Sequence, residues 1–336
     1  MASTIGRVNK LSVDIRKLQQ TPDGTFFLSV PKAWAKRFNL TKSSMVYIHE
    51  RSDGCLVLDP QYTEETSPEI SLPVTDRVED DILSSYLLGY EIITLNSDRI
   101  GTKDRERIKS AINRLVGVEI VEETPKKVVL QCLLKASAFS PDKILRREYV
   151  LSSGLFREAL ASFASSDRTL AESVLERDEE VDRLYFLLVR LLRTLILNPR
   201  LGEKLSFSLI DCLDYRLIAS LMENIADQAV ELSRLTLRLR GRKLEAAFAK
   251  RFLELGEAVK QSYDEVVKAI FSREERVIRT ANEKLQHAER ILDDVEANLG
   301  RLGEQLPEAY SAAPLFRRIL DYLSDMVDLV TPKRRL

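Results

Sequence analysis

Residues 174–195, VLERDEEVDRLYFLLVRLLRTL, are the stretch that decides the fold. Its apolar side chains return at intervals of three, four or seven positions: Val174, Val181, Leu184, Leu188, Leu191 and Leu195. This spacing is typical of one face of an α-helix. The stretch therefore predicts a long helix that packs one side against a helical core.

The same periodicity extends from about residue 141 to residue 330. It breaks near residues 198–199, Gly241, Ser272 and residues 306–307, which suggests about six helices. The segment also resembles two weak copies of a three-helix unit, over about residues 141–240 and 243–331. The copies are clearest in their third helices, where MENIAD at 222–227 aligns with LDYLSD at 320–325. We therefore predict an all-α domain over residues 141–331.

A small α/β module is predicted immediately before the helices, over residues 76–135. Its expected elements alternate along the chain: a helix from about 76, a strand at 91–95, a helix at 103–115, and strands at 118–122 and 127–133. Residues 61–75, QYTEETSPEISLPVT, contain two prolines and several polar residues, and we interpret them as a linker.

The first sixty residues favour strands around one short helix. Strands are expected at residues 11–20, 25–30, 45–50 and 55–58, with a helix at 32–38. Pro31 suits the first turn of that helix. Residues 22–24 (PDG) and 53–54 (DG) are turn signals, the second of them typical of a β-hairpin.

Charge is distributed unevenly along the chain. Residues 1–45 contain eight basic residues against two acidic ones, a net charge of +6. The whole chain of 336 residues has a net charge of −1, which leaves −7 for the remainder. A basic head on an acidic body indicates an anionic partner for the head.

Composition excludes several classes of protein. Cys55, Cys132 and Cys212 form no CxxC pattern, which suggests a reducing compartment without a disulfide framework. With two histidines in the chain, a Cys/His zinc finger is excluded and a histidine-based catalytic triad is not favoured. We expect no signal peptide and no transmembrane segment, and hence a cytoplasmic protein. Neither a GxxxxGK(S/T) loop, a GxSxG elbow nor a Glu-x-x-His pair occurs, so we expect no catalytic residues and no enzyme.

Residues 16–60 resemble the AbrB (SpoVT/AbrB-like) family of swapped-hairpin domains. The resemblance rests on a basic strand at 16–17, the SVPK junction at 29–32, Trp34, the turn from Leu40 to Val46, and the closing hairpin. The family usually has Gly-Asp before the third strand, where this chain has residues 43–44 (SS), so the geometry of that turn is open. A β unit of about fifty residues without a disulfide or metal cannot bury enough apolar surface alone, and exchanging hairpins with a second chain would solve this.

The resemblance implies DNA binding by a dimer through basic side chains of the N-terminal domain, residues 1–60. By position, the candidates are Arg7, Lys10, Arg16, Lys17, Lys32, Lys36 and Arg37. Lysine and arginine mainly contact phosphates, which makes affinity sensitive to salt, and arginine can also read guanine edges. The alternative is that these charges only solvate a small dimerisation module. Trp34 is expected in its core.

Residues 141–331 resemble the PhoU family of phosphate-uptake regulators. The shared motif is an acid, three residues and an aspartate, present as DEEVD at 178–182 and ENIAD at 223–227. The stretch LMENIADQAV at 221–230 follows the family's third-helix pattern. The resemblance implies two three-helix repeats with paired acids that bind iron or another divalent metal. In the second repeat the counterparts are DYLSD at 321–325 and a degraded EKLQH at 283–287.

The spacing itself suits a cation site, because residues four apart lie on one helix face, one turn apart. The candidate ligands are Asp178, Asp182, Glu223 and Asp227, with Glu283, His287, Asp321 and Asp325 as weaker candidates. Like charges this close repel, so a divalent or ferric ion (iron, manganese or zinc) would relieve them. The alternative is a solvated acidic face, which is favoured for the four weaker candidates.

Taken together, the chain resembles archaeal fusions of an AbrB-like head to a PhoU-like body, with the α/β module between them. We predict a multidomain, phosphate-responsive transcription regulator that acts as a homodimer or higher oligomer. Its expected partners are DNA and a phosphate transporter or phosphate-signalling proteins. One alternative is an adaptor that inhibits a phosphate ABC transporter by protein contact without binding DNA. A metal-carboxylate enzyme is a third class, for which no substrate pocket is indicated.

Overall fold

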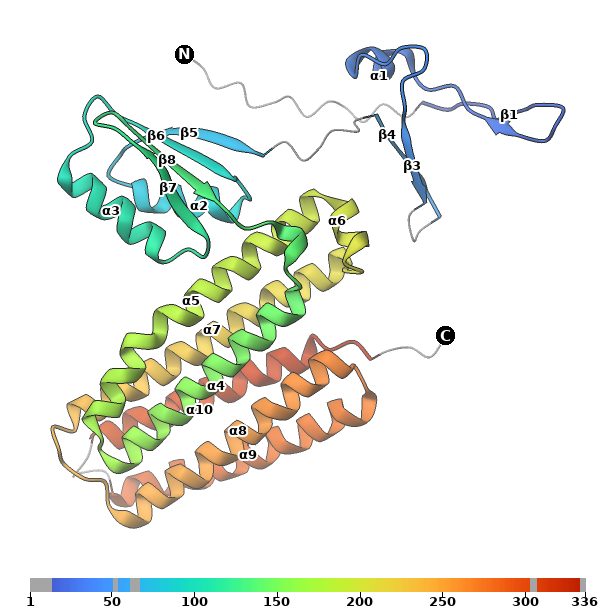
Figure 1. Ribbon diagram of the computed structural model, residues 1–336. Coiled ribbons are helices and arrows are strands. Elements are labelled where there is room, and N and C mark those ends of the chain that lie inside the picture. Colours follow the sequence, from blue (N-terminus) through green and yellow to red (C-terminus); the bar gives the residue numbers. More distant parts are fainter. Residues whose placement is uncertain (1–13, 51–53, 61–66, 303–306, 333–336) are drawn as a thin grey trace. The chain divides into compact units, whose positions relative to one another are not determined.

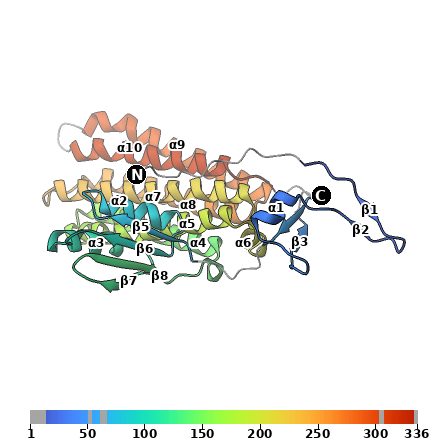
Figure 2. The same cartoon turned by 90° about the horizontal axis from the view of Figure 1, so that it is seen from above.

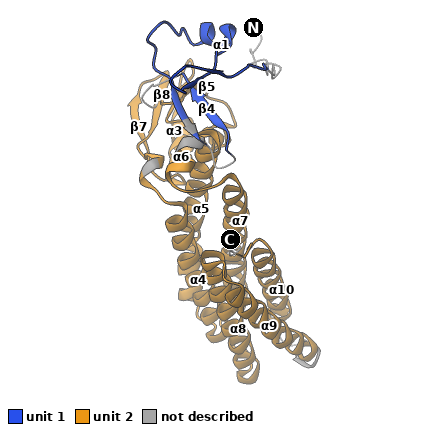
Figure 3. Cartoon of the chain, turned by 90° about the vertical axis from the view of Figure 1, so that its right-hand side faces the viewer, with its two compact units in different colours: residues 1–66 blue, residues 67–336 orange. Residues whose placement is uncertain are grey.

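The computed structural model describes residues 14–50, 54–60, 67–302 and 307–332. The chain divides into two compact units, residues 1–66 and residues 67–336, which are coloured separately in Figure 3. The α/β module and the helical domain, which the sequence separated, therefore belong to one unit. Each unit is described by itself.

The described residues of unit 1 form two short hairpins and one helix. Strands β1 (Gln19–Gln20) and β2 (Phe26–Phe27) pair antiparallel, as do β3 (Tyr47–Glu50) and β4 (Leu56–Asp59). Helix α1 (Lys32–Arg37) lies between the hairpins in the chain and begins directly after Pro31. The strands expected at 11–20 and 25–30 are therefore shorter than predicted, with two paired residues each.

The apolar side chains of unit 1 are not enclosed. Phe26, Ile48 and Leu56 are 64%, 63% and 68% exposed, and no described side chain of this unit is buried. Trp34, expected in a core, is half-buried and makes an edge-to-face contact with Phe38 at 5.5 Å. A unit of this size closes too little surface on itself, so its strands retain exposed apolar groups.

The serine turn before β3 adopts the conformation that a glycine would take. Ser43 has φ of 81°, in the left-handed region that ordinary residues avoid. The Thr41 backbone N–H donates to the Ser44 hydroxyl at 2.8 Å and supports the turn. A hydrogen bond of this kind offsets part of the strain at Ser43.

Unit 2 begins with the α/β module. Its elements are β5 (Glu69–Pro73), α2 (Val78–Leu87), β6 (Ile92–Asn96), α3 (Thr102–Asn113), β7 (Val118–Glu123) and β8 (Lys127–Cys132). The sheet has the order β5-β6-β8-β7, with β5 parallel to β6 and the other neighbours antiparallel. Tyr86, Leu95 and Leu130 are fully buried at its core.

Strand β5 corrects the interpretation of residues 61–75 as a linker. Residues 69–73 form an edge strand that pairs with β6 along its whole length. Prolines are tolerated at the end of an edge strand, where no neighbour needs their missing N–H. The prolines that suggested a linker therefore mark the ends of a strand instead.

In the part of the chain that the structure describes, six long helices follow the module, and a short helix lies between the second and the third. They are α4 (Pro141–Ser165), α5 (Arg168–Leu197), α6 (Pro199–Lys204), α7 (Leu209–Arg238), α8 (Ala246–Ser272), α9 (Glu275–Leu302) and α10 (Pro307–Asp328). Helices α4, α5 and α7 pack together, as do α8, α9 and α10, and contacts of α4 with α8 and of α7 with α10 join the two sets (Figure 1). In Figure 2, α9 and α10 lie on the opposite side of α7 from the α/β module.

Local signals explain where these helices begin and how closely they pack. Asp167 accepts a hydrogen bond from the Leu170 N–H before α5, and Ser208 forms a reciprocal capping box with Asp211 before α7. Gly256 of α8 lies so close to α4 that an added Cβ would be 2.0 Å from Leu160. The absence of a side chain there lets the two helix sets approach each other.

Arg190 of α5 attaches the α/β module to the helices. Its buried guanidinium donates to the carbonyl oxygens of Tyr86 at 2.6 Å, Tyr90 at 2.9 Å and Gly89 at 3.1 Å. It also lies 4.8 Å from the centroid of the Tyr86 ring. Carbonyl groups at the C-terminal end of a helix lack partners within the helix and favour a nearby positive charge. Arg190 supplies that charge, together with hydrogen bonds, at the C-terminal end of α2.

Within the described residues, no helix has the length and hydropathy needed to span a membrane.

Candidate functional site

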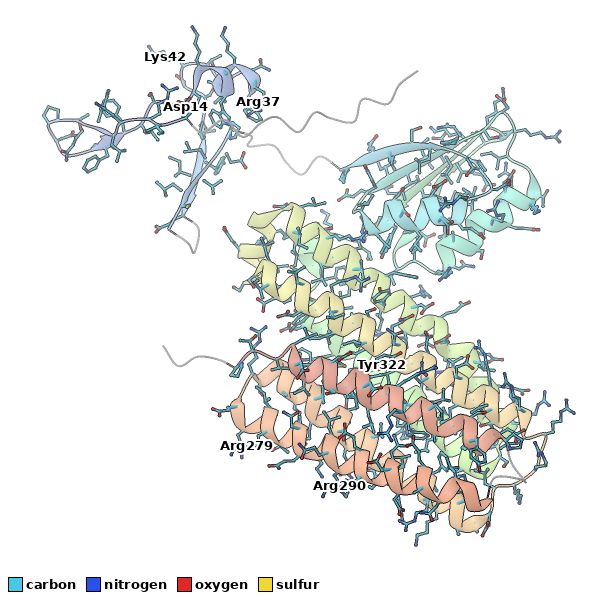
Figure 4. All side chains as sticks on the ribbon, turned by 180° about the vertical axis from the view of Figure 1, so that it is seen from behind. Asp14, Arg37, Lys42, Arg279, Arg290 and Tyr322 are labelled. Atoms are coloured by element: carbon cyan, nitrogen blue, oxygen red, sulfur yellow. The ribbon has the colours of Figure 1, made fainter. Side chains whose placement is uncertain are left out.

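The basic candidates of unit 1 are available at its surface. Arg16, Lys17, Lys32, Lys36 and Arg37 are all exposed, whereas Arg7 and Lys10 lie outside the described residues. Arg16 forms an ion pair with Asp14 at 2.7 Å. The Arg37 guanidinium lies 5.1 Å from the centroid of the Phe38 ring, and Figure 4 labels Arg37 near Lys42.

The structure brings the two acidic pairs of the first helix set together. Asp178 and Asp182 lie on α5, Glu223 and Asp227 lie on α7, and these two helices pack against each other. All four side chains are half-buried. They form a cluster, here called the acidic site, in which each carboxylate is within electrostatic reach of at least one other.

Burial and mutual repulsion disfavour the charged forms of these groups. Burial first, and then Asp182 and Asp227, raise the pKa of Asp178 to about 6. Burial and the other three carboxylates raise the pKa of Glu223 to about 7. The pKa values of Asp182 and Asp227 are raised by burial as well. The acidic site therefore holds fewer negative charges near neutral pH than its four carboxyl groups would carry in water.

Three arginines oppose these carboxylates, Arg114 from the end of α3 and Arg216 and Arg234 from α7 itself. Arg114, at the C-terminal end of α3, lies 3.8 Å from Asp182 and stacks 5.5 Å from the centroid of the Phe186 ring. Arg234 lowers the pKa values of Asp178 and Asp227, and Arg216 lowers that of Glu223. The sequence spacing had indicated no basic partner, because these arginines lie outside the four-residue pattern.

The chemistry of the acidic site suits a hard cation, but its geometry does not form a closed set of ligands. Carboxylate oxygens are the donors that such ions take. In the part of the chain that the structure describes, however, no three His, Cys, Asp or Glu side chains are grouped so that they could hold a metal ion. A cation would require rotation of these side chains, and Arg114 would compete with it for Asp182.

Glu148 of α4 is a further acidic residue beside this site that the spacing of acids in the sequence did not indicate. This side chain is fully buried, and neither of its carboxylate oxygens has a hydrogen-bond partner. Burial, and then Glu223, raise its pKa well above the ordinary value, while Arg216 acts in the opposite direction. Glu148 follows Ile144 by four residues on the apolar face of α4, and a charged residue at such a position was the available signal.

The acidic candidates of the second helix set remain apart from any such cluster. Glu283 and His287 of α9 and Asp321 and Asp325 of α10 are all exposed. For these four residues the solvated face stays a prediction.

A comparison with protein families finds a match within the first helix set. The PhoU domain matches residues 145–236, which run from α4 to α7. Similar solved structures include the phosphate transport system regulatory protein PhoU from Streptococcus pneumoniae, with 14% identity and a TM-score of 0.49 over 56% of this chain and 91% of that one. PhoU from Pseudomonas aeruginosa has 16% identity and a TM-score of 0.46, with coverages of 56% and 93%. A comparison with curated proteins finds no match.

Proposed function

We propose, with the PhoU domain at residues 145–236 as the premise, that this chain is a phosphate-responsive transcription regulator of phosphate uptake. In this proposal unit 1 binds DNA as a dimer and the helical domain senses phosphate status. The observation that carries it is the combination of a PhoU domain with a separate unit whose basic side chains are exposed.

Exposed apolar strands support a dimer of unit 1. Phe26, Ile48 and Leu56 leave more than half of their surface exposed, on strands of two to four residues. Exchange of hairpins with a second copy, as in the AbrB-like domains that this segment resembles, would bury these groups. It would also double the number of basic side chains available to one DNA site.

A specific surface favours the alternative, an adaptor that regulates a phosphate transporter by protein contact. Leu209, Ile210, Leu213 and Leu217 at the start of α7 are 55%, 66%, 62% and 47% exposed. Apolar residues at helical spacing on a surface are typical of protein-binding sites. In the adaptor alternative, unit 1 would serve only to dimerise.

DNA binding by variants of unit 1 tests the proposal. Arg16→Ala with Lys17→Ala is expected to weaken DNA binding about tenfold or more and to reduce the slope of log affinity against log salt by about two, because two phosphate contacts are lost. The measurement is a fluorescence titration of the full chain at several salt and phosphate concentrations. Arg276→Ala with Arg279→Ala, two exposed arginines of α9, is the matched control.

The competing outcomes are distinct. Parent protein that binds no DNA at any phosphate concentration, while sedimenting as a dimer, would favour the adaptor. A monomer at micromolar concentration with unit 1 folded would contradict the exchanged-hairpin dimer.

We also propose that the acidic site takes up a divalent or ferric ion after its side chains rotate. Elemental analysis of chelator-free protein after exposure to iron, manganese or zinc should then find metal. Glu223→Ala with Asp227→Ala should lower the amount, and Arg114→Gln should raise affinity because it removes the competing cation at Asp182. Asp321→Ala with Asp325→Ala is the matched control, since these acids are exposed. Equal metal content in the parent and the Glu223/Asp227 variant would identify the acidic site as a solvated face.

A further inference from the structure

An open pocket lined by arginines lies where the chain passes from the first helix set to the second. It has a volume of about 380 Å³ and is lined by Arg238, Arg240, Arg242 and Glu308. Arg238 is the last residue of α7, Arg240 and Arg242 lie in the link to α8, and Glu308 lies in the first turn of α10. This link is the yellow-orange chain at the lower left of Figure 1.

Positive charge in this pocket is only partly neutralised. Arg242 donates to Glu308 Oε1 at 2.5 Å and to the Leu239 carbonyl oxygen at 3.2 Å. Among the described residues, the guanidinium groups of Arg238 and Arg240 have no hydrogen-bond or ion-pair partner. The three guanidinium groups and one carboxylate leave a net charge of +2 in the pocket.

The helix dipole does not account for this set of arginines. Basic residues in the last turn of a helix are common because they stabilise its C-terminal carbonyls. Arg238 fits that explanation, but Arg240 and Arg242 follow the helix, and the pair of Arg242 with Glu308 joins the link to α10. Neighbouring like charges repel, so an anion bound among them would be stabilised by all three.

We propose that this pocket binds a small anion that contains two or more linked phosphate groups. Guanidinium groups pair with phosphate oxygens through two parallel hydrogen bonds, and two arginines without partners can serve two phosphate groups. The volume is within the range of small-molecule sites and exceeds the size of one phosphate ion. The described residues that line the pocket include no aromatic side chain, so they offer contacts to a phosphate chain and no stacking platform for a base.

This pocket is separate from the acidic site. Asp227 and Arg238 are eleven residues apart on α7, a distance of about 16 Å along the helix. The match to the PhoU domain ends at residue 236, before the three arginines. The proposal therefore goes beyond the proposed function and stands without it.

Calorimetric titration of the full chain with tripolyphosphate, in metal-free buffer at constant ionic strength, tests the proposal. Arg238→Gln with Arg240→Gln is expected to weaken binding about tenfold or more, because two charge-assisted contacts are lost. Arg276→Gln with Arg279→Gln is the matched control and should bind as the parent does. Pyrophosphate is expected to bind more tightly than orthophosphate or sulfate, which each offer one anionic group.

A second variant is expected to bind tripolyphosphate more tightly than the parent does. Glu308→Gln removes the carboxylate that occupies Arg242, so affinity for tripolyphosphate should rise about threefold to tenfold. The proposal is overturned if the parent does not bind tripolyphosphate at millimolar concentration, or if the Arg238/Arg240 variant binds as tightly as the parent. Equal affinity for sulfate and pyrophosphate would also contradict it, as would weaker binding by Glu308→Gln. The three arginines are exposed, whereas the Glu308 side chain is 11% exposed, so thermal unfolding of each variant checks that the fold is retained.

Discussion

Replacing Arg190 by alanine is expected to lower the free energy of unfolding of unit 2 by about 3–5 kcal/mol. Arg190 is 6% exposed, and its guanidinium donates to the backbone carbonyls of Tyr86, Gly89 and Tyr90. Its loss removes three charge-assisted hydrogen bonds and the contact with the Tyr86 ring. The α/β module should then separate more readily from the helices.

Urea unfolding of the full chain measures the loss, and hydrogen exchange locates it. Amides of α2 and the sheet are expected to exchange faster in Arg190→Ala, whereas those of α8 and α10 should change little. Arg193→Ala is the matched control, because Arg193 lies on the same helix and is exposed. A loss no greater than that of the control would show that Arg190 does not hold the module. Arg190→Lys should recover only part of the stability, since one ammonium group cannot reach three carbonyls in the geometry of a planar fork.

Replacing Glu148 by methionine is expected to raise the free energy of unfolding by about 2–4 kcal/mol at pH 8. Glu148 is fully buried with both oxygens unpaired, so its charged form is strongly disfavoured in the folded chain. Methionine has a similar length, no charge and a flexible side chain that adapts to the space among α4, α7 and α8. The free energy of unfolding rises because the variant lacks a carboxyl group that must either be buried with its charge or bind a proton.

The effect should grow with pH. Because the pKa of Glu148 is raised in the folded state, the folded chain binds a proton that the unfolded chain releases above pH 4.5. Stability is therefore lost as the pH rises from the unfolded pKa towards the folded pKa, and it stays low above that value. The difference in stability between Glu148→Met and the parent should be small at pH 5 and large at pH 8.

Urea unfolding at the two pH values measures this difference. Glu176→Met, at an exposed position of α5, is the matched control and should show no growth of the difference with pH. Subtracting the parent removes the contribution of Asp178, whose raised pKa acts in the same direction. A difference that is the same at both pH values, or a loss of stability at pH 8, would contradict the account of Glu148.

Helical periodicity alone determined much of unit 2. The stretch at 174–195 predicted a helix, and α5 spans Arg168–Leu197 around it. The breaks expected near residues 198–199, Gly241 and Ser272 lie at the ends of α5, α7 and α8. These features are local, since periodicity, caps and turn residues act within a few positions of the chain.

The sequence predicted the four carboxylates of the acidic site but not the arginine that approaches them from α3. A spacing of four residues is about one turn of a helix, so it put Asp178 and Asp182 on one helix face and Glu223 and Asp227 on another. Arg114, which approaches Asp182 from α3, could not be found in the same way, because the two residues are 68 positions apart and meet only through the docking of the module.

Only the tertiary structure decided the features that depend on distant partners. Strand β5 is five residues long and bounded by prolines, and it is a strand because β6 supplies its hydrogen bonds. Arg190 interrupts an apolar run and is buried because the end of α2 presents carbonyl groups to it. Hydrogen bonds and ion pairs between elements depend on where packing places each backbone, whereas the helices themselves follow from the order of apolar and polar residues along the chain.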